Sequence, residues 1–426
     1  MPIEASIVRQ IRDAVDAGRI DTVAMLQELV RTPSVTGSEG NAQRIVEILL
    51  SARRLTIDRW EATADDIAAY HDHVGVQTVF ADRPNVAGRR QGIGAGRSIL
   101  LNAHIDTVET GDPTTWSVDP LGGDVREGRL YGRGACDMKG GLVSFLAAFD
   151  ALDALGIVLA GDATILSTVG EEDGGLGALS AVLRGHRADA VLITEPTRLS
   201  LVPAQGGSLV FRLTVDGKSA HAAVRDRGVS ALEKFIPIFE DLLWLERERN
   251  ATLRHPLYQH IQNKVPMNIG VVRSGLWAST VPESLIAEGR IGLIPGEDVG
   301  VFRQQVIDRI TRAAQRDPWL REHPPRIEWF GGQFAPAETP VDSPIARAVL
   351  SAHTAVTGSP PAIEGVPYGA DMRLFTIIGG MPCVMYGAGD VDIAHHADEH
   401  IVIDDLLTAA TTIACLLVDW CGVSRS

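Results

Sequence analysis

The sequence predicts an α/β protein with a mostly parallel sheet and helices on both faces, interrupted by a smaller inserted βαββαβ unit of the ferredoxin-like kind. Two observations indicate this fold class. Apolar strand-like runs alternate with helical segments as far as about residue 203. After Gly206-Gly207 the order becomes strand, helix, two strands, helix and strand, and beyond Phe334 the first pattern resumes. We therefore expect one domain from residues 1–206 and 333–426, and an inserted domain from residues 207–332.

The spacing of apolar residues predicts each element in turn. Apolar residues three and four positions apart predict amphipathic helices over residues 7–31 and 39–53. Apolar runs predict strands of the main sheet at residues 98–103, 163–169 and 190–193. In the insert we expect strands at 209–215, 267–272, 285–293 and 326–329 and helices at 229–247 and 298–315, and a last helix follows at 403–421. The glycine run at 92–96 leads into a strand and opens no helix, so it predicts a hairpin turn and not a phosphate loop.

Composition and charge favour a soluble enzyme. The chain has 426 residues, of which 45% are hydrophobic, enough for two domains with sizeable cores. Its net charge of −15 argues against nucleic acid or an anionic membrane surface as a partner. No apolar run approaches a membrane span, the first residues lack a basic and apolar leader, and the four cysteines form no CxxC pair. We therefore expect a cytoplasmic protein.

Five separated clusters of acidic and histidine residues predict a site for two metal ions. Two cations about 3.5–4 Å apart need a bridging carboxylate, with one imidazole and one further carboxylate for each ion. Each cluster alone is as consistent with a turn, a helix cap or a solvated pair as with a ligand. Three of them, however, follow the predicted strands directly, where ligands of open α/β sheets gather. The clusters contain His104 with Asp106, then Asp137, then Glu171 with Glu172, then Glu195, and finally His395.

The order of these motifs resembles the M20 family of metallopeptidases and deacylases. The matching motifs are His-x-Asp, Gly-Arg-Gly-x-x-Asp-Met-Lys-Gly-Gly, Glu-Glu, Glu-Pro-Thr and His-x-x-Asp-Glu, from about His104 to the end of the chain. The family includes acetylornithine deacetylases, succinyl-diaminopimelate desuccinylases, aminoacylases and glutamate carboxypeptidases. The segments 205–207 and 277–282 are similar to its ArgE/DapE-like branch of deacylases and deformylases. The resemblance implies that the insert is a lid and dimerisation domain, and therefore that the protein is a homodimer.

The resemblance also implies a ligand set. Asp137 would bridge both ions, and the peptide after it, Asp137-Met138, would be cis. One ion would be completed by His104 and Glu195, and the other by Glu172 and His395. His395 is preferred over its neighbour His396 by the His-x-x-Asp-Glu pattern. Oxygen and imidazole ligands without thiolate suit Zn²⁺, our first expectation, and also Mn²⁺ or Co²⁺.

Three residues are expected to act in catalysis. Glu171 holds no ion and would act as general base towards a water activated by the two ions, later returning the proton to the departing amine. Asp106 would accept the second ring N–H of His104 and fix its tautomer. His221 would reach into the partner subunit's site and stabilise the oxyanion, as its counterpart does in the resembled family.

Four residues are expected to bind substrate. Arg290 matches the lid arginine that holds a substrate carboxylate by two parallel hydrogen bonds. Gly369 and Arg373 belong to a run similar to the family's substrate-side glycine loop, where Arg373 is either an anion contact or an ion-pair partner of Asp371. Ser279 replaces an asparagine that is common in the family, and Ala370 replaces a threonine or serine. These two departures weaken the case for the acetylornithine and diaminopimelate substrates.

The function favoured by these residues is hydrolysis of an amide-type C–N bond in a small carboxylate-bearing substrate, as in an N-acyl amino acid or amine deacylase. An aminohydrolase that releases ammonia from an activated, for example aromatic, carbon uses the same groups. So does a dipeptidase or carboxypeptidase. A non-catalytic binding protein of this fold is disfavoured, because it has no use for Glu171.

Overall fold

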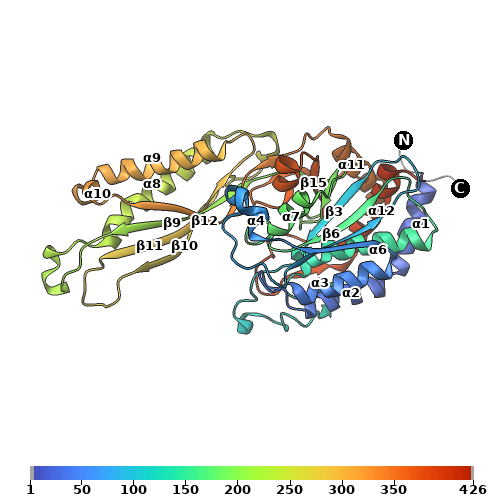
Figure 1. Ribbon diagram of the computed structural model, residues 1–426, viewed down its shortest axis with the longest axis horizontal. Helices are drawn as coiled ribbons and strands as arrows, with labels where there is room; N and C mark the ends of the chain where they lie inside the picture. Colours follow the sequence, from blue (N-terminus) through green and yellow to red (C-terminus); the bar gives the residue numbers. More distant parts are fainter. Residues whose placement is uncertain (1–3, 424–426) are drawn as a thin grey trace.

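The computed structural model describes residues 4–423 and shows two lobes (Figure 1). The larger lobe, which holds both chain ends, is a twisted sheet of nine strands flanked by helices. The smaller lobe, green to orange in Figure 1, is a four-stranded sheet with two long helices packed on it. The predicted α/β fold class with a second, antiparallel sheet unit is confirmed. No helix within residues 4–423 is long and apolar enough to cross a lipid bilayer.

The large sheet is parallel in its centre and mixed towards its edges, where β1-β2, β2-β6, β15-β8 and β13-β8 are antiparallel and β14-β8 is parallel. Its order is β1-β2-β6-β3-β7-β15-β8-β13, with β14 beside β8. Strands β6, β3, β7 and β15 run parallel to one another and are buried. Residues 92–96 connect β2 to β3, but β6 lies between these strands, so the predicted hairpin turn is wrong. The strands are β1 Thr56–Glu61, β2 Pro84–Arg90, β3 Ile99–His104, β6 Ala163–Thr168, β7 Val191–Ile193, β8 Leu201–Gln205, β13 Ala337–Glu338, β14 Ile363–Val366 and β15 Cys383–Met385.

Helices that flank this sheet bury their apolar residues in one continuous core. The last helix, α12, has the predicted limits Ile403–Cys421 and is buried on nearly every side, because it packs against α1, α6 and α11. The single helix predicted over residues 7–31 is two helices instead. They separate at Gly18, whose N–H bonds to the carbonyls of Ala14 and Val15 and ends the first helix. The other helices of this lobe are α1 Ala5–Ala17, α2 Arg19–Arg31, α3 Gly40–Ala52, α4 Ala64–Ile67, α5 His71–Val74, α6 Gly140–Ala154, α7 Leu176–Arg184 and α11 Pro344–Thr357.

The smaller lobe has the predicted βαββαβ order with one additional short helix. Its sheet order is β10-β11-β9-β12, and all neighbours are antiparallel. Alternate residues of β9, such as Phe211 and Leu213, face a core made with α8 and α9. The elements are β9 Gly207–Asp216, α8 Ala231–Thr252, β10 Met267–Ser274, β11 Ser284–Leu293, α9 Val299–Gln315, α10 Pro318–Glu322 and β12 Arg326–Phe334.

A third, small sheet was not predicted from the sequence. It joins β4 (Val125–Arg126), β5 (Arg129–Tyr131) and β16 (His400–Val402) in antiparallel pairs. The N–H of Gly132 continues this pairing with the carbonyl of Glu399. The small sheet therefore holds the segment before Asp137 against the segment after His395.

Candidate metal centre

The ends of three parallel strands place most of the predicted ligands at one edge of the large sheet. His104 is the last residue of β3, Glu171-Glu172 follow β6 by two residues, and Glu195 follows β7 by one. Because β6, β3 and β7 are parallel neighbours, their carboxyl ends meet at the same edge. The placement expected from the apolar runs is confirmed.

Asp137 reaches this edge from the turn Ala135–Lys139, which leads into α6 and in which Asp137 and Met138 have non-helical backbone angles. The Asp137-Met138 peptide is cis, as the family resemblance implied. The turn is fixed by Glu399, a buried carboxylate that accepts hydrogen bonds from the backbone N–H groups of Cys136 at 3.1 Å and Asp137 at 3.2 Å. Arg133 forms an ion pair with the other oxygen of Glu399.

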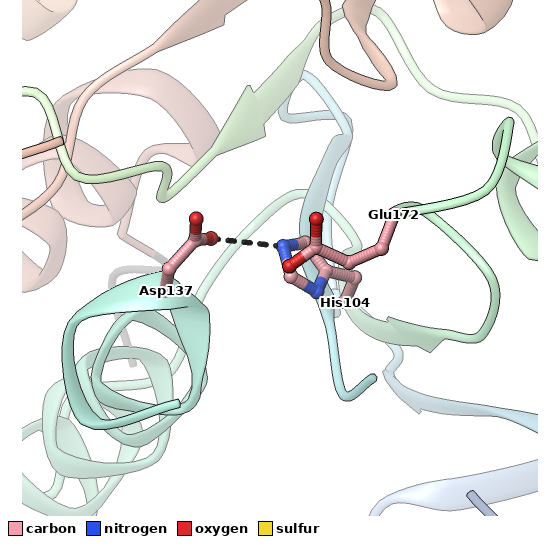
Figure 2. A group of neighbouring side chains, drawn as sticks. All are labelled: His104, Asp137 and Glu172. Carbon is pink, nitrogen blue, oxygen red and sulfur yellow. Dashed lines mark hydrogen bonds and ion pairs between the residues drawn. The ribbon is translucent and has the colours of Figure 1, made fainter. Parts of the chain in front are cut away.

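Asp137 contacts both predicted histidine ligands, each through a different oxygen. Its Oδ1 lies 3.1 Å from Nε2 of His104, and its Oδ2 lies 3.5 Å from Nε2 of His395. Glu172 Oε1 lies 3.0 Å from the same Nε2 of His395. Figure 2 shows Asp137 and Glu172 approaching His104 from two sides, and ligand atoms of these three residues lie within 4.8 Å of one another.

The charged groups of this cluster favour the binding of cations. Burial, together with the charges of neighbouring carboxylates, raises the pKa values of Glu171 and Glu195 well above the ordinary range. Burial lowers the pKa of His104, but its hydrogen bond to Asp137 and the surrounding carboxylates outweigh this effect and raise it. The hydrogen bond to Glu172 raises the pKa of His395 to about 9. Four carboxylates thus share one cavity with too little positive charge, a deficit that divalent ions would fill.

Asp106 lies beside His104 as predicted, but its carboxylate does not make the expected hydrogen bond. The Nδ1 of His104 bonds to the backbone oxygen of Asp106 at 3.0 Å, and the nearest carboxylate oxygen is 3.6 Å away. The carboxylate instead accepts from the backbone N–H groups of Glu171 at 3.2 Å and Glu172 at 3.1 Å. The sequence suggested the pair His104–Asp106 but not these contacts, because they arise only when β3 and β6 lie side by side.

A cavity of about 320 Å³ opens between the two lobes beside this cluster. Arg290 of β11 and Gly369, two of the residues expected to bind substrate, line it. Within residues 4–423 the Arg290 side chain has no ion-pair partner, its buried Nε has no hydrogen-bond partner, and burial lowers its pKa. A Cβ on Gly369 would lie 2.5 Å from Cβ of Phe334, so glycine is needed at this wall. The cavity is also lined by Asp137, Glu171, Glu172, Glu195, Phe334, Tyr368 and His395.

Of the residues expected to contact substrate, three do not line this cavity. Arg373 is buried, donates to the carbonyls of His73, Gly174 and Ala370, and lies over the ring of Phe334 at 4.1 Å. No ion pair between Arg373 and Asp371 occurs among the described residues, so neither of the two expected roles of Arg373 is supported. His221 and Ser279 are exposed on the smaller lobe, where His221 forms an isolated antiparallel bridge with Thr280, the residue after Ser279.

The structure adds a residue that sequence reasoning missed. Tyr368 lines the cavity, and its buried hydroxyl has no hydrogen-bond partner among residues 4–423. Burial and the charges of Glu195 and Asp137 raise its pKa well above the ordinary value, so it is a neutral donor. The one feature of the sequence that could have indicated Tyr368 as a site residue is its position directly before Gly369.

Comparisons with known proteins found a matching family, relatives in sequence and neighbours in structure. The model of peptidase family M20/M25/M40 matches residues 100–419. An N-formyl-4-amino-5-aminomethyl-2-methylpyrimidine deformylase of Halalkalibacterium halodurans is 26% identical over 99% of each chain. An acetylornithine deacetylase of Myxococcus xanthus is 30% identical over 82% of this chain and 86% of its own. Among solved structures, a dipeptidase of Saccharomyces cerevisiae superposes with a TM-score of 0.79 at 15% identity, covering 98% of this chain and 99% of its own. A dinuclear metal binding peptidase of the M20 family from Bacillus subtilis has a TM-score of 0.61 at 16% identity, covering 96% and 100%.

Proposed function

Because this chain belongs to peptidase family M20/M25/M40, a family of hydrolases that act on C–N bonds, we propose that it removes a small acyl group from an amine that carries a carboxylate. The observation that carries the proposal is the cavity between the lobes. It is lined both by Arg290, which has no ion-pair partner among residues 4–423, and by the acidic residues Glu171, Glu172 and Asp137. A substrate anion at Arg290 would leave its amide carbonyl facing Glu171.

Two divalent ions are part of this proposal. Asp137 would lie between them, with His104 and Glu195 on one side and Glu172 and His395 on the other. The contacts of Asp137 with both imidazoles through separate oxygens support this arrangement. When bound, the ions activate a water molecule and polarise the carbonyl oxygen. The ligand types favour Zn²⁺ and also suit Mn²⁺ or Co²⁺.

Glu171 is the residue that moves the proton in this mechanism. Its buried carboxylate lines the cavity and is bonded to neither histidine. It takes a proton from the attacking water as the water oxygen bonds to the carbonyl carbon, and it gives that proton to the amine nitrogen as the C–N bond breaks. The products are a carboxylic acid and a free amine.

The activities named for the relatives in sequence favour acyl removal over peptide cleavage. The deformylase and the deacetylase both carry names that denote removal of a one-carbon or two-carbon acyl group. The dipeptidase is similar in fold only. We therefore place small N-acyl amines first and dipeptides second.

A panel of substrates tests the proposed function. The purified protein, supplied with Zn²⁺, Mn²⁺ or Co²⁺, is assayed on N-formyl and N-acetyl amino acids, dipeptides and amino-substituted aromatic acids. We expect release of free amine from one or more of the N-acyl compounds. Release of ammonia from the aromatic acids, with no turnover of N-acyl compounds, would instead identify an aminohydrolase.

Arg290 is expected to select substrates that carry a carboxylate. Arg290→Lys keeps the charge but cannot form two parallel hydrogen bonds, so most of kcat/KM should be lost, and Arg290→Ala should lose somewhat more. The matched control is Arg273→Lys on the neighbouring strand, an exposed arginine outside this cavity. Steady-state kinetics on an N-acyl amino acid and on its uncharged carboxamide measure the effect. An unchanged kcat/KM on the acid would remove Arg290 from the site.

His221 is proposed to act across a dimer interface formed by the smaller lobes. It is exposed and does not line the cavity of its own chain, so a role in the reaction requires the partner subunit. His221→Ala should lower kcat by about 10²–10³, the usual effect of removing an oxyanion donor. Mixing this variant with Glu171→Ala should restore activity, because a mixed dimer rebuilds one intact site. If subunits exchange and no activity returns, His221 has no role in trans.

A further inference from the structure

Asp106 connects three segments of the chain through one buried carboxylate. Its Oδ1 accepts from the N–H of Glu171, and its Oδ2 accepts from the N–H of Glu172 and, at 3.0 Å, from the hydroxyl of Thr36. The Asp106 side chain is fully buried. Thr36 lies in the loop after α2, which is joined to the end of β3 by hydrogen bonds from Thr36 N to Thr107 O and from Thr107 N to Ser34 O.

From these contacts we infer that Asp106 and Thr36 are positioning residues for the Glu171-Glu172 turn. The inference rests on the proposed function, in which Glu171 is the base and Glu172 an ion ligand. Two consecutive backbone N–H groups held by one carboxylate fix the direction in which both side chains leave the main chain. Thr36 holds the carboxylate in turn, so a residue with no contact to substrate controls the geometry of the reacting groups.

A carboxylate is required at position 106 because all three of its partners are donors. An ionised carboxylate only accepts, whereas asparagine offers one oxygen and one NH₂ group. In either orientation of Asp106→Asn, the NH₂ group would face the N–H of Glu171 or of Glu172. The hydrogen bond of His104 would be spared, because its partner is the backbone oxygen of Asp106. This variant therefore separates the effect on the turn from an effect on the imidazole.

Thr36 offers a milder test that leaves the Asp106 carboxylate in place. Thr36→Val has the same shape and lacks only the hydroxyl, while Thr36→Ser keeps the hydroxyl. The matched control is Thr354→Val on α11, because Thr354 is also half-buried and its hydroxyl donates to a helix carbonyl, that of Leu350. The two hydroxyls differ in their acceptor, which is the Asp106 carboxylate for Thr36 and a backbone carbonyl for Thr354.

Two measurements on the full-length protein test the inference. Asp106→Asn should lower kcat by about 10–100-fold, and Thr36→Val by about tenfold, with KM for a carboxylate substrate within about twofold. KM should stay nearly constant because Arg290, which is proposed to bind the substrate carboxylate, lies on β11 of the other lobe. Thr36→Ser should regain most of the wild-type kcat, and Thr354→Val should match the wild type.

Calorimetric titration with Zn²⁺ gives a readout that is independent of turnover. Thr36→Val should weaken one binding step about tenfold, since Glu172 shares the turn, and Thr36→Ser should not. If Asp106→Asn does not fold, the Thr36 variants alone test the inference. Wild-type kcat and Zn²⁺ affinity in Thr36→Val, or a loss that Thr36→Ser does not restore, would overturn the inference. If the wild-type protein hydrolyses no compound of the substrate panel, the proposed function is contradicted. The Zn²⁺ titration of the Thr36 variants would still test whether Asp106 and Thr36 position the Glu171-Glu172 turn.

Discussion

Glu171→Gln is expected to lower kcat by about 10²–10⁴ while the protein keeps both ions. Glutamine has the same shape and fills the same buried position, but it cannot accept a proton from water. Glu171 is not among the residues assigned to either ion, so metal content should not change. Single-turnover assays on an N-acyl substrate, combined with elemental analysis of the same preparation, measure both quantities.

The neighbouring residue provides the control for this experiment. Glu172→Gln changes the same chemical group one residue away, where Oε1 lies 3.0 Å from His395. It should reduce metal content as well as rate. If Glu171→Gln retained near-wild-type kcat, the proton would have to be taken by another group, and the mechanism proposed for Glu171 would be wrong.

Asp137→Ala is expected to lose both ions and therefore all measurable activity. The reason is that one carboxylate faces both His104 and His395, so its removal opens both ligand sets at once. Glu195→Ala, by comparison, should mainly weaken one ion. Elemental analysis after gel filtration measures the ions per chain, and circular dichroism checks that the fold is kept. Retention of one tightly bound ion in Asp137→Ala would contradict the bridging role.

The sequence predicted the long, periodic elements well. Helix α12 and the strands and helices of the insert follow from apolar spacing over many residues, and this signal does not depend on distant partners. The break at Gly18 was missed because the apolar pattern continues through it. Strands of two or three residues, as in the small third sheet, are too short to show any period.

Part of the candidate site could likewise be predicted, and part could not. The positions of His104 and Glu195 follow from strand ends, which a single sequence reveals. Arg373 was misjudged because its partners are backbone carbonyls of His73 and Gly174, and no residue pattern marks such contacts. Tyr368 was missed for a similar reason, since a lone tyrosine has no motif and only the folded cavity shows its unpaired hydroxyl.

The most direct test of a two-ion hydrolase is to measure activity against the number of bound ions. Metal-free protein is titrated with Zn²⁺, and the ions per chain and the rate of N-acyl substrate hydrolysis are followed in the same samples. The ligand set around Asp137 predicts that binding saturates at about two ions per chain and that full activity is reached only with both bound. Full activity with a single ion per chain, or hydrolysis that persists after complete removal of metal, would contradict it.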